Sequence, residues 1–180
     1  MSSQTVEWRH LLHRIPETGF EERETADAVA EILTGLGVEH VRGVGGTGIV
    51  ASLRRGSSDR AIGLRADMDG LPIGEQTGLP YSSEHADRMH ACGHDGHMAM
   101  VLGAGARLVD EGGFDGTVHL LFQPAEEHGK GAKAMLADGL LERFPMQQVF
   151  GLHNLPGLPT GTLHTRAGGI MASEDNFEIR

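Results

Sequence analysis

The chain has 180 residues, of which 39% are hydrophobic, and both values are ordinary for one globular domain with a core of its own. It carries 15 Lys and Arg residues against 25 Asp and Glu residues, so its formal net charge is −10. This acidic balance, without a basic run, disfavours nucleic acid as a partner. The longest uninterrupted apolar stretch, Met98 to Ala106, is far shorter than the ~20 residues that a membrane-spanning helix needs.

The single cysteine, Cys92, excludes a disulfide within the chain and leaves one thiol whose role must be explained. The first seven residues lack the charged and apolar regions of a signal peptide. We therefore expect a cytoplasmic protein that has no membrane partner.

Apolar residues at helical spacing predict two amphipathic helices near the start of the chain. The first covers about residues 6–15 and is ended by Pro16, and the second covers about residues 26–33 and stops at the Gly35-Leu36-Gly37 segment. Strands are predicted next, over residues 38–42, 48–53 and 61–66. The glycine cluster at 43–48 predicts a hairpin turn, because it lacks the spacing and the following helix of a nucleotide-binding loop.

The second half of the chain continues the alternation of helices and strands. We predict a helix over 95–111, a strand over 117–122, a helix over 132–141 and a strand over 148–152. Beyond Gly157 the sequence becomes rich in Pro and Gly, with one predicted strand over 161–166 and strand-like sequence at 176–180. The predicted fold class is therefore α/β, with helices on both faces of a sheet.

Three short stretches carry side chains that bind metals: Cys92-Gly93-His94-Asp95, Glu126-Glu127 and His153-Asn154. A thiolate, imidazoles and a carboxylate suit zinc, manganese or nickel, and a neighbouring second acid can take a proton from water. Ligands gather at the carboxyl edge of an α/β sheet, where these stretches, together with Asp67 and Asp69, are expected to lie. The sequence therefore predicts a metallohydrolase site at that edge.

Each candidate also has a simpler interpretation. Cys92 can be a small buried hydrophobic residue, or a nucleophile, although the second role leaves the paired glutamates without a function. Glu126 and Glu127 can be a solvated pair at the start of a helix. His153 can be an ordinary surface histidine.

The neighbouring histidines and aspartates are weaker candidates. We take His94 as the ligand, and His90 and His97 as polar neighbours, because Gly93 makes one helix through all three unfavourable. Asp95 and Asp69 can either orient the ligating imidazoles or bridge ions, or they can cap a helix or form a turn.

Four segments, taken in order, resemble the M20 family of metallopeptidases, and specifically its amidohydrolase branch of the hippurate hydrolase and N-acyl-amino-acid amidohydrolase type. The four segments are Leu64-Arg-Ala-Asp-Met-Asp-Gly-Leu-Pro-Ile73, Met89-His-Ala-Cys-Gly-His-Asp-Gly-His97, Phe122-Gln-Pro-Ala-Glu-Glu127 and Gly151-Leu-His-Asn-Leu-Pro156. The resemblance covers nearly the whole chain and implies a zinc-peptidase-like α/β catalytic domain. It also implies a centre of two divalent metal ions, zinc, manganese or nickel, and hydrolysis of an amide between an acyl group and an amino acid.

The resemblance assigns roles to six residues. It implies that Glu126 is the general base and that Asp69 is an acid that helps to orient the centre. It also implies four metal ligands: Cys92, His94, Glu127 and His153. Gly70 stands where the family usually has alanine, and Met98 where threonine is common; neither supplies a ligand.

The resemblance also predicts a domain organisation. It implies that residues 1–166 are an incomplete catalytic domain and that residues 167–180 begin a lid or dimerisation domain, so that the chain is the amino-terminal part of the family's architecture. The full-length form is then expected to act on a small N-acyl-amino-acid substrate and to form a homodimer, while the 180 residues alone turn over little. Two rival functions stay open, a truncated metal-binding remnant without activity and a dipeptidase of the same superfamily.

Overall fold

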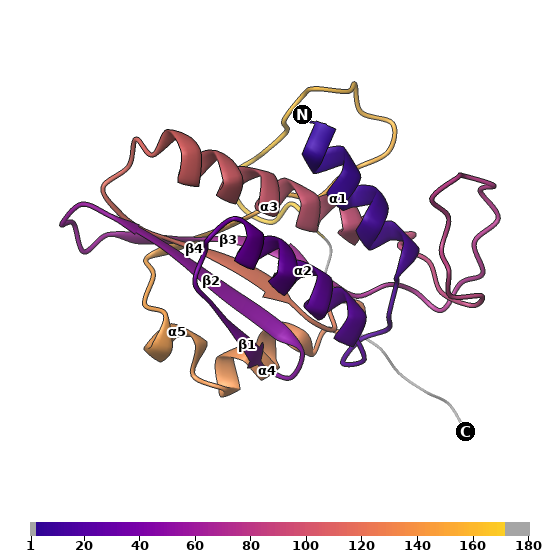
Figure 1. Cartoon of the computed structure of the whole chain (residues 1–180), viewed down its shortest axis with the longest axis horizontal. Helices are drawn as coiled ribbons and strands as arrows, with labels where there is room; N and C mark the ends of the chain where they lie inside the picture. The colour runs from indigo at the N-terminus through magenta and orange to yellow at the C-terminus, as the bar shows by residue number, and fades with distance from the viewer. Residues whose placement is uncertain (1–2, 172–180) are drawn as a thin grey trace.

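A five-stranded mixed sheet forms the centre of the computed structural model, which describes residues 3–171 (Figure 1). Its strands lie in the order β1-β2-β4-β3-β5, where β1 is His40–Val44, β2 Gly48–Arg55, β3 Ala61–Asp67, β4 Gly116–Gln123 and β5 Gln148–Gly151. Strand β3 is parallel to both of its neighbours, β4 and β5, whereas β2 is antiparallel to β1 and β4. The three parallel strands therefore end at the same edge of the sheet.

Helices cover both faces of this sheet, which confirms the predicted α/β fold. Helices α1 (Ser3–Arg14), α2 (Arg23–Gly35) and α3 (His94–Glu111) lie on one face, and the short helices α4 (Gly131–Ala137) and α5 (Leu140–Arg143) lie on the other (Figure 1). Because successive side chains of a strand point to opposite faces, β4 serves both cores. Leu120 and Phe122 belong to the larger core under α1, α2 and α3, whereas Leu121 packs with Met135 and Leu140.

Two local predictions, a hairpin and a helix, have different outcomes. The hairpin predicted at residues 43–48 is confirmed by the antiparallel pairing of β1 with β2. The single helix predicted over 132–141 is wrong, because the chain breaks between α4 and α5 at Gly139, which has a φ of 78°. A left-handed residue of this kind ends a helix.

The strand predicted over residues 161–166 is also wrong. These residues are exposed and irregular, and they pair with no strand in the described part of the chain. A strand needs a neighbour to accept and donate its backbone hydrogen bonds, and local sequence cannot supply one. The strand-like segment 176–180 lies outside the described residues, and none of the described helices is long and apolar enough to cross a membrane.

Candidate metal centre

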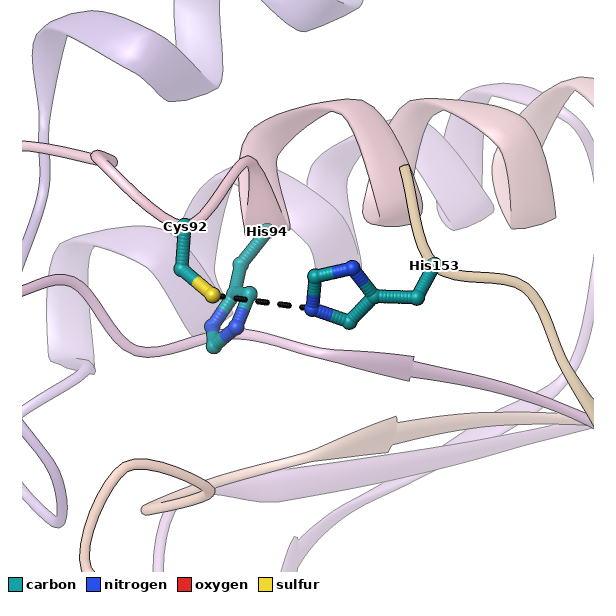
Figure 2. A group of neighbouring side chains, drawn as sticks. All are labelled: Cys92, His94 and His153. Carbon is teal, nitrogen blue, oxygen red and sulfur yellow. Dashed lines mark hydrogen bonds between the residues drawn. The ribbon is translucent and has the colours of Figure 1, made fainter. Parts of the chain in front are cut away.

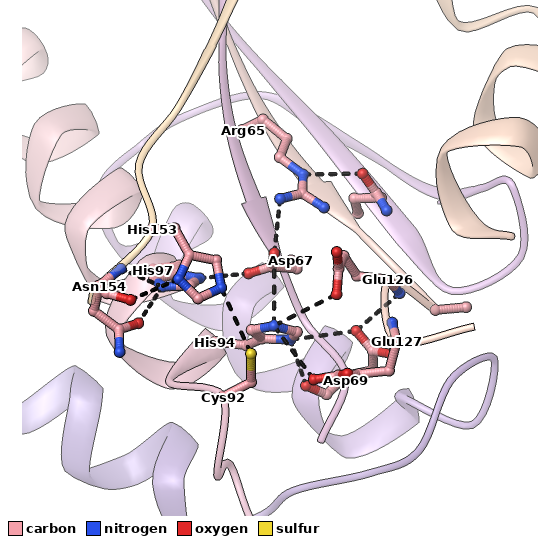
Figure 3. Close-up of polar contacts among 12 residues, drawn as sticks. Arg65, Asp67, Asp69, Cys92, His94, His97, Glu126, Glu127, His153 and Asn154 are labelled. Atoms are coloured by element: carbon pink, nitrogen blue, oxygen red, sulfur yellow. Dashed lines mark hydrogen bonds and ion pairs between the residues drawn. The ribbon is translucent and has the colours of Figure 1, made fainter. Parts of the chain in front are cut away.

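The site is built at the carboxyl edge of the sheet by the ends of three parallel strands and the start of α3. Asp67 is the last residue of β3, and His94 is the first residue of α3. Glu126 and Glu127 follow β4, and His153 follows β5. The structure thus brings together the three motifs that the sequence singled out (Figure 3).

His94 lies at the middle of this cluster and is fully buried. Its Nδ1 donates a hydrogen bond of 2.7 Å to the backbone oxygen of Asp69, which directs the Nε2 atom toward the acids. Nε2 lies 3.7 Å from Oε1 of Glu127, and both atoms are buried without a hydrogen-bond partner among the described residues. Buried polar atoms are almost always satisfied, so an imidazole nitrogen and a carboxylate oxygen that face each other in this way fit a shared cation.

Cys92 and His153 approach the same place from the other side. The Sγ atom of Cys92 lies 3.5 Å from Nε2 of His153 (Figure 2). Gly93 turns the chain between Cys92 and His94 with a φ of 86°, and a Cβ atom there would collide with the side chain of Asn154. This left-handed turn at Gly93 brings Cys92 and His94 into one group of potential ligands with His153.

Spacing of the potential ligand atoms fits metal coordination. Three groups each have ligand atoms within 4.8 Å of one another, and all three include His94: Cys92, His94 and His153; Asp67, His94 and His97; and His94, Glu126 and Glu127. Metal–ligand bonds of about 2.0–2.3 Å place neighbouring ligands of a zinc ion roughly 3–4 Å apart. The soft thiolate and the harder imidazoles and carboxylates would together suit zinc, manganese or nickel.

The electrostatics of the site also favour a cation. Burial, reinforced by the nearby carboxylates of Glu127 and Glu126, raises the pKa of the Cys92 thiol to about 12. Burial alone would lower the pKa of His94, but the hydrogen bond with Asp69 and the charges of Asp67 and Glu127 raise it overall. The raised pKa of the thiol and the raised pKa of the imidazole both indicate surplus negative charge, which a divalent ion would neutralise.

The two glutamates of the pair have different surroundings. The Glu127 side chain is 23% exposed and that of Glu126 is 39% exposed. Burial raises the pKa of Glu126, and the neighbouring charge of Asp67 adds to this effect. Glu126 is thus the more exposed of the two acids, and its raised pKa makes it a stronger proton acceptor than an ordinary glutamate.

Asp69 connects the motifs through its carboxylate. The backbone N–H groups of Glu126 and Glu127 donate to its two oxygens, each at 3.0 Å. Burial would raise the pKa of Asp69, but its hydrogen bonds with His94 and these amides lower it. Asp69 thus holds the backbone of both glutamates, which is consistent with the orienting role that the sequence suggested for it.

Two further residues, Asp67 and His97, join the cluster. The sequence placed Asp67 at this edge without a role and took His97 as a polar neighbour, so it selected neither as a ligand. The Nδ1 atom of His97 donates to Oδ1 of Asp67 at 2.7 Å, and its Nε2 accepts from the backbone N–H of Asn154 at 3.1 Å. Arg65 donates to the other oxygen of Asp67 at 2.7 Å. The signals were present, since Asp67 and Asp69 are two residues apart at a strand end and His94 and His97 share a helix face.

Asp95 and His90 lie beside the cluster rather than within it. The Asp95 carboxylate accepts hydrogen bonds from Arg9 at 2.9 Å and from His13 at 2.8 Å, and no side-chain hydrogen bond caps the start of α3. Asp95 therefore takes up neither a capping role nor a place among the ligand groups. Burial lowers the pKa of His90 to about 4, so its ring is a neutral neighbour.

Comparison with known proteins places this geometry in a family. Residues 63–180 match the model of peptidase family M20/M25/M40. The chain belongs to the M20 family. It is 48% identical over 171 residues to the hippurate hydrolase of Campylobacter jejuni, an alignment that covers 95% of this chain and 44% of the relative.

Other M20 relatives agree with this assignment. The chain is 42% identical to the N-acetyl-L-cysteine deacetylase of Bacillus subtilis, with 99% of this chain and 43% of the relative covered. The crystal structure of a dinuclear metal-binding M20 peptidase from Bacillus subtilis superposes with a TM-score of 0.81 at 39% identity, covering 87% of this chain and 44% of that chain. The resemblance predicted from the four motifs is confirmed, and the chain spans less than half the length of these M20 relatives.

Proposed function

We propose that this M20 chain is the catalytic part of a metal-dependent hydrolase that cleaves the amide bond of N-acyl amino acids. The observation that supports it most is a pair of buried atoms, His94 Nε2 and Glu127 Oε1, which have no hydrogen-bond partner within residues 3–171, with the more exposed Glu126 beside them. The similarity to a hippurate hydrolase and to an N-acetyl-L-cysteine deacetylase supports the substrate class.

In this proposal the metal ligands are Cys92, His94, Glu127 and His153, and two divalent ions, zinc, manganese or nickel, are held among them. Bound there, the ions would polarise the scissile carbonyl and lower the pKa of an attacking water molecule. Asp67 and His97 complete the ring of potential ligands around His94.

Glu126 is the general base of the proposed reaction. Its carboxylate takes a proton from the attacking water as the water oxygen bonds to the acyl carbon, and then gives that proton to the amine nitrogen as the C–N bond breaks. Asp69 keeps the two glutamates in place through their backbone amides.

The motif resemblance supports the rest of the proposal. Residues 1–166 form the catalytic domain, residues from 167 onward begin a lid or dimerisation domain, and the full-length protein is a homodimer. A cytoplasmic location stays a prediction of the sequence.

The test uses the full-length protein that the gene encodes, loaded with zinc or manganese. We expect hydrolysis of hippurate and N-acetyl amino acids, measured as release of the free amino acid, and loss of that activity after chelation. Preferential cleavage of free dipeptides would instead establish a dipeptidase. Tight metal binding without turnover of either class would establish a metal-binding module.

A further inference from the structure

The turn that carries the paired glutamates has an unusual backbone. Ala125, directly before Glu126, is completely buried and has a φ of 46°, in the left-handed region that residues with a side chain rarely occupy. Such a conformation persists only when surrounding contacts determine it. The contacts of Ala125 therefore determine the conformation of this turn.

The carbonyl of Ala125 accepts a backbone hydrogen bond of 3.0 Å from the N–H of Gly131, and its own N–H is bound by a second buried carboxylate, that of Glu22. Its Oε1 accepts a hydrogen bond of 2.8 Å from the backbone N–H of Ala125, and its Oε2 accepts one of 2.5 Å from the hydroxyl of Thr47. Glu22 is fully buried, although it lies 103 residues from Ala125 in the sequence. A buried charge is costly unless its hydrogen bonds satisfy it, and these two donors offset part of the effect of burial, which raises the pKa of Glu22.

Together, Glu22 and Asp69 bind three consecutive backbone amides. The N–H of Ala125 donates to Glu22, and the N–H groups of Glu126 and Glu127 donate to Asp69. The preceding residue, Pro124, has no N–H, so each amide that the turn offers from Pro124 to Glu127 is bound by a carboxylate. The directions of the Glu126 and Glu127 side chains therefore depend on both acids.

We infer that Glu22 is a positioning residue, which fixes the left-handed turn at Ala125 and thereby orients Glu126 and Glu127 at the candidate metal centre. It acts from the loop before α2, outside the four motifs, and it is not a member of the three potential ligand groups found among the described residues. The consequence for metal binding and catalysis rests on the proposed function, whereas the effect on the turn does not.

The test compares variants that separate the reach of the side chain from its charge. Glu22→Gln keeps an oxygen at the same distance, while Glu22→Asp keeps the charge but is one methylene too short, and Glu22→Ala removes the acceptor. Glu21→Ala is the control, because Glu21 is the neighbouring acid, with a side chain that is 59% exposed.

The first readout, amide hydrogen exchange of residues 125–127 in the metal-free protein, is independent of function. We expect at least tenfold faster exchange in Glu22→Asp and Glu22→Ala, while Glu22→Gln and Glu21→Ala stay within threefold of wild type. Unchanged exchange in Glu22→Asp would overturn the inference. If Glu22→Ala does not fold, Glu22→Asp and Glu22→Gln still decide the question.

The second readout connects the turn to the site. We expect metal affinity, titrated with zinc against a competing chelator, to fall about 10–100-fold in Glu22→Asp, the usual cost of losing a residue that supports a ligand. In the full-length enzyme kcat should fall by a similar factor, with KM within threefold. Faster exchange with wild-type zinc affinity would overturn the positioning role, whereas a wild-type protein that binds zinc but hydrolyses no N-acyl amino acid would contradict only the proposed function.

Discussion

At the scale of single residues, the adjacent acids Glu126 and Glu127 have distinct surroundings although they are neighbours in sequence. Oε1 of Glu127 is buried and faces His94, while the side chain of Glu126 is the more exposed and its Oε2 lies 3.8 Å from the same imidazole nitrogen. A metal ion held through Glu127 would let Glu126 remain a free carboxylate that accepts protons. The two roles therefore follow from burial rather than from residue type.

The assignment of Glu126 predicts a separation of binding from chemistry. Glu126→Gln in the full-length protein should retain its metal but lose about 10²–10⁴-fold in kcat, because the amide has a similar shape but cannot accept the proton. Metal content is measured by elemental analysis and kcat by amino-acid release. Glu142→Gln, at an exposed acid of α5, is the control. A Glu126→Gln enzyme with wild-type kcat would show that another group accepts the proton.

At the scale of elements, α1 is attached to the start of α3 by buried charges. His13 of α1 donates to Asp95, one residue after His94, and its Nε2 lies 3.3 Å from Oε1 of Glu75. Arg9, one turn earlier on α1, also donates to Asp95. This contact fixes the end of α3 from which His94 and His97 project.

The contact between α1 and α3 predicts a pH dependence of stability. The hydrogen bond to Asp95 raises the pKa of His13 above 6.5 despite the opposing effect of burial, and the charge of Glu75 adds to it. The folded state therefore gains stability from the protonated ring below pH 6.5 and loses it as the pH rises through the raised pKa. His13→Asn should lower the free energy of unfolding by about 1.5–3 kcal/mol at pH 6, the usual range for a hydrogen bond to a charged group.

The difference in the free energy of unfolding between wild type and His13→Asn should then be smaller at pH 9 than at pH 6. Urea unfolding at both pH values measures it. Asp95 and Glu75 contact the nitrogens of the His13 ring, and Arg9 donates to the same oxygen of Asp95. The rings of Tyr81 and His90 also lie beside it, with centroids 5.6 Å and 6.4 Å away. His10→Asn, which alters a ring stacked on Tyr81 on the same helix, is the control. An equal difference at pH 6 and pH 9 would contradict the assignment of the charge to His13.

Some helices and strands of the structure could be predicted from the sequence, and others could not. Strands β3 and β4 were predictable because each is a largely apolar run; β3 ends in Asp67 and β4 is followed, after a short turn, by Glu126. The convergence of these ends follows from the geometry of parallel strands. The break at Gly139 and the absence of a strand over 161–166 depend on local backbone conformation and on available neighbours, which periodicity does not contain. The contact between His97 and Asp67 was not predicted for a related reason, since it joins two elements 30 residues apart.

At the scale of the whole molecule, the candidate centre exists only in the folded chain. Its side chains come from β3, the start of α3 and the segments after β4 and β5, and they are separated by up to 86 residues, from Asp67 to His153. An unfolded chain cannot bring these groups around one ion, so a metal that binds there stabilises the folded state specifically.

The stability of the 180-residue chain should therefore depend on metal concentration. Zinc at about 100 times its Kd should raise the free energy of unfolding by about 2.7 kcal/mol, and the thermal midpoint should rise with it and return after chelation. Calorimetry with and without zinc measures the shift. His94→Ala should abolish it, because His94 belongs to all three ligand groups, whereas His164→Ala, at an exposed histidine, should leave it unchanged. An equal shift in wild type and His94→Ala would place the bound zinc elsewhere on the protein.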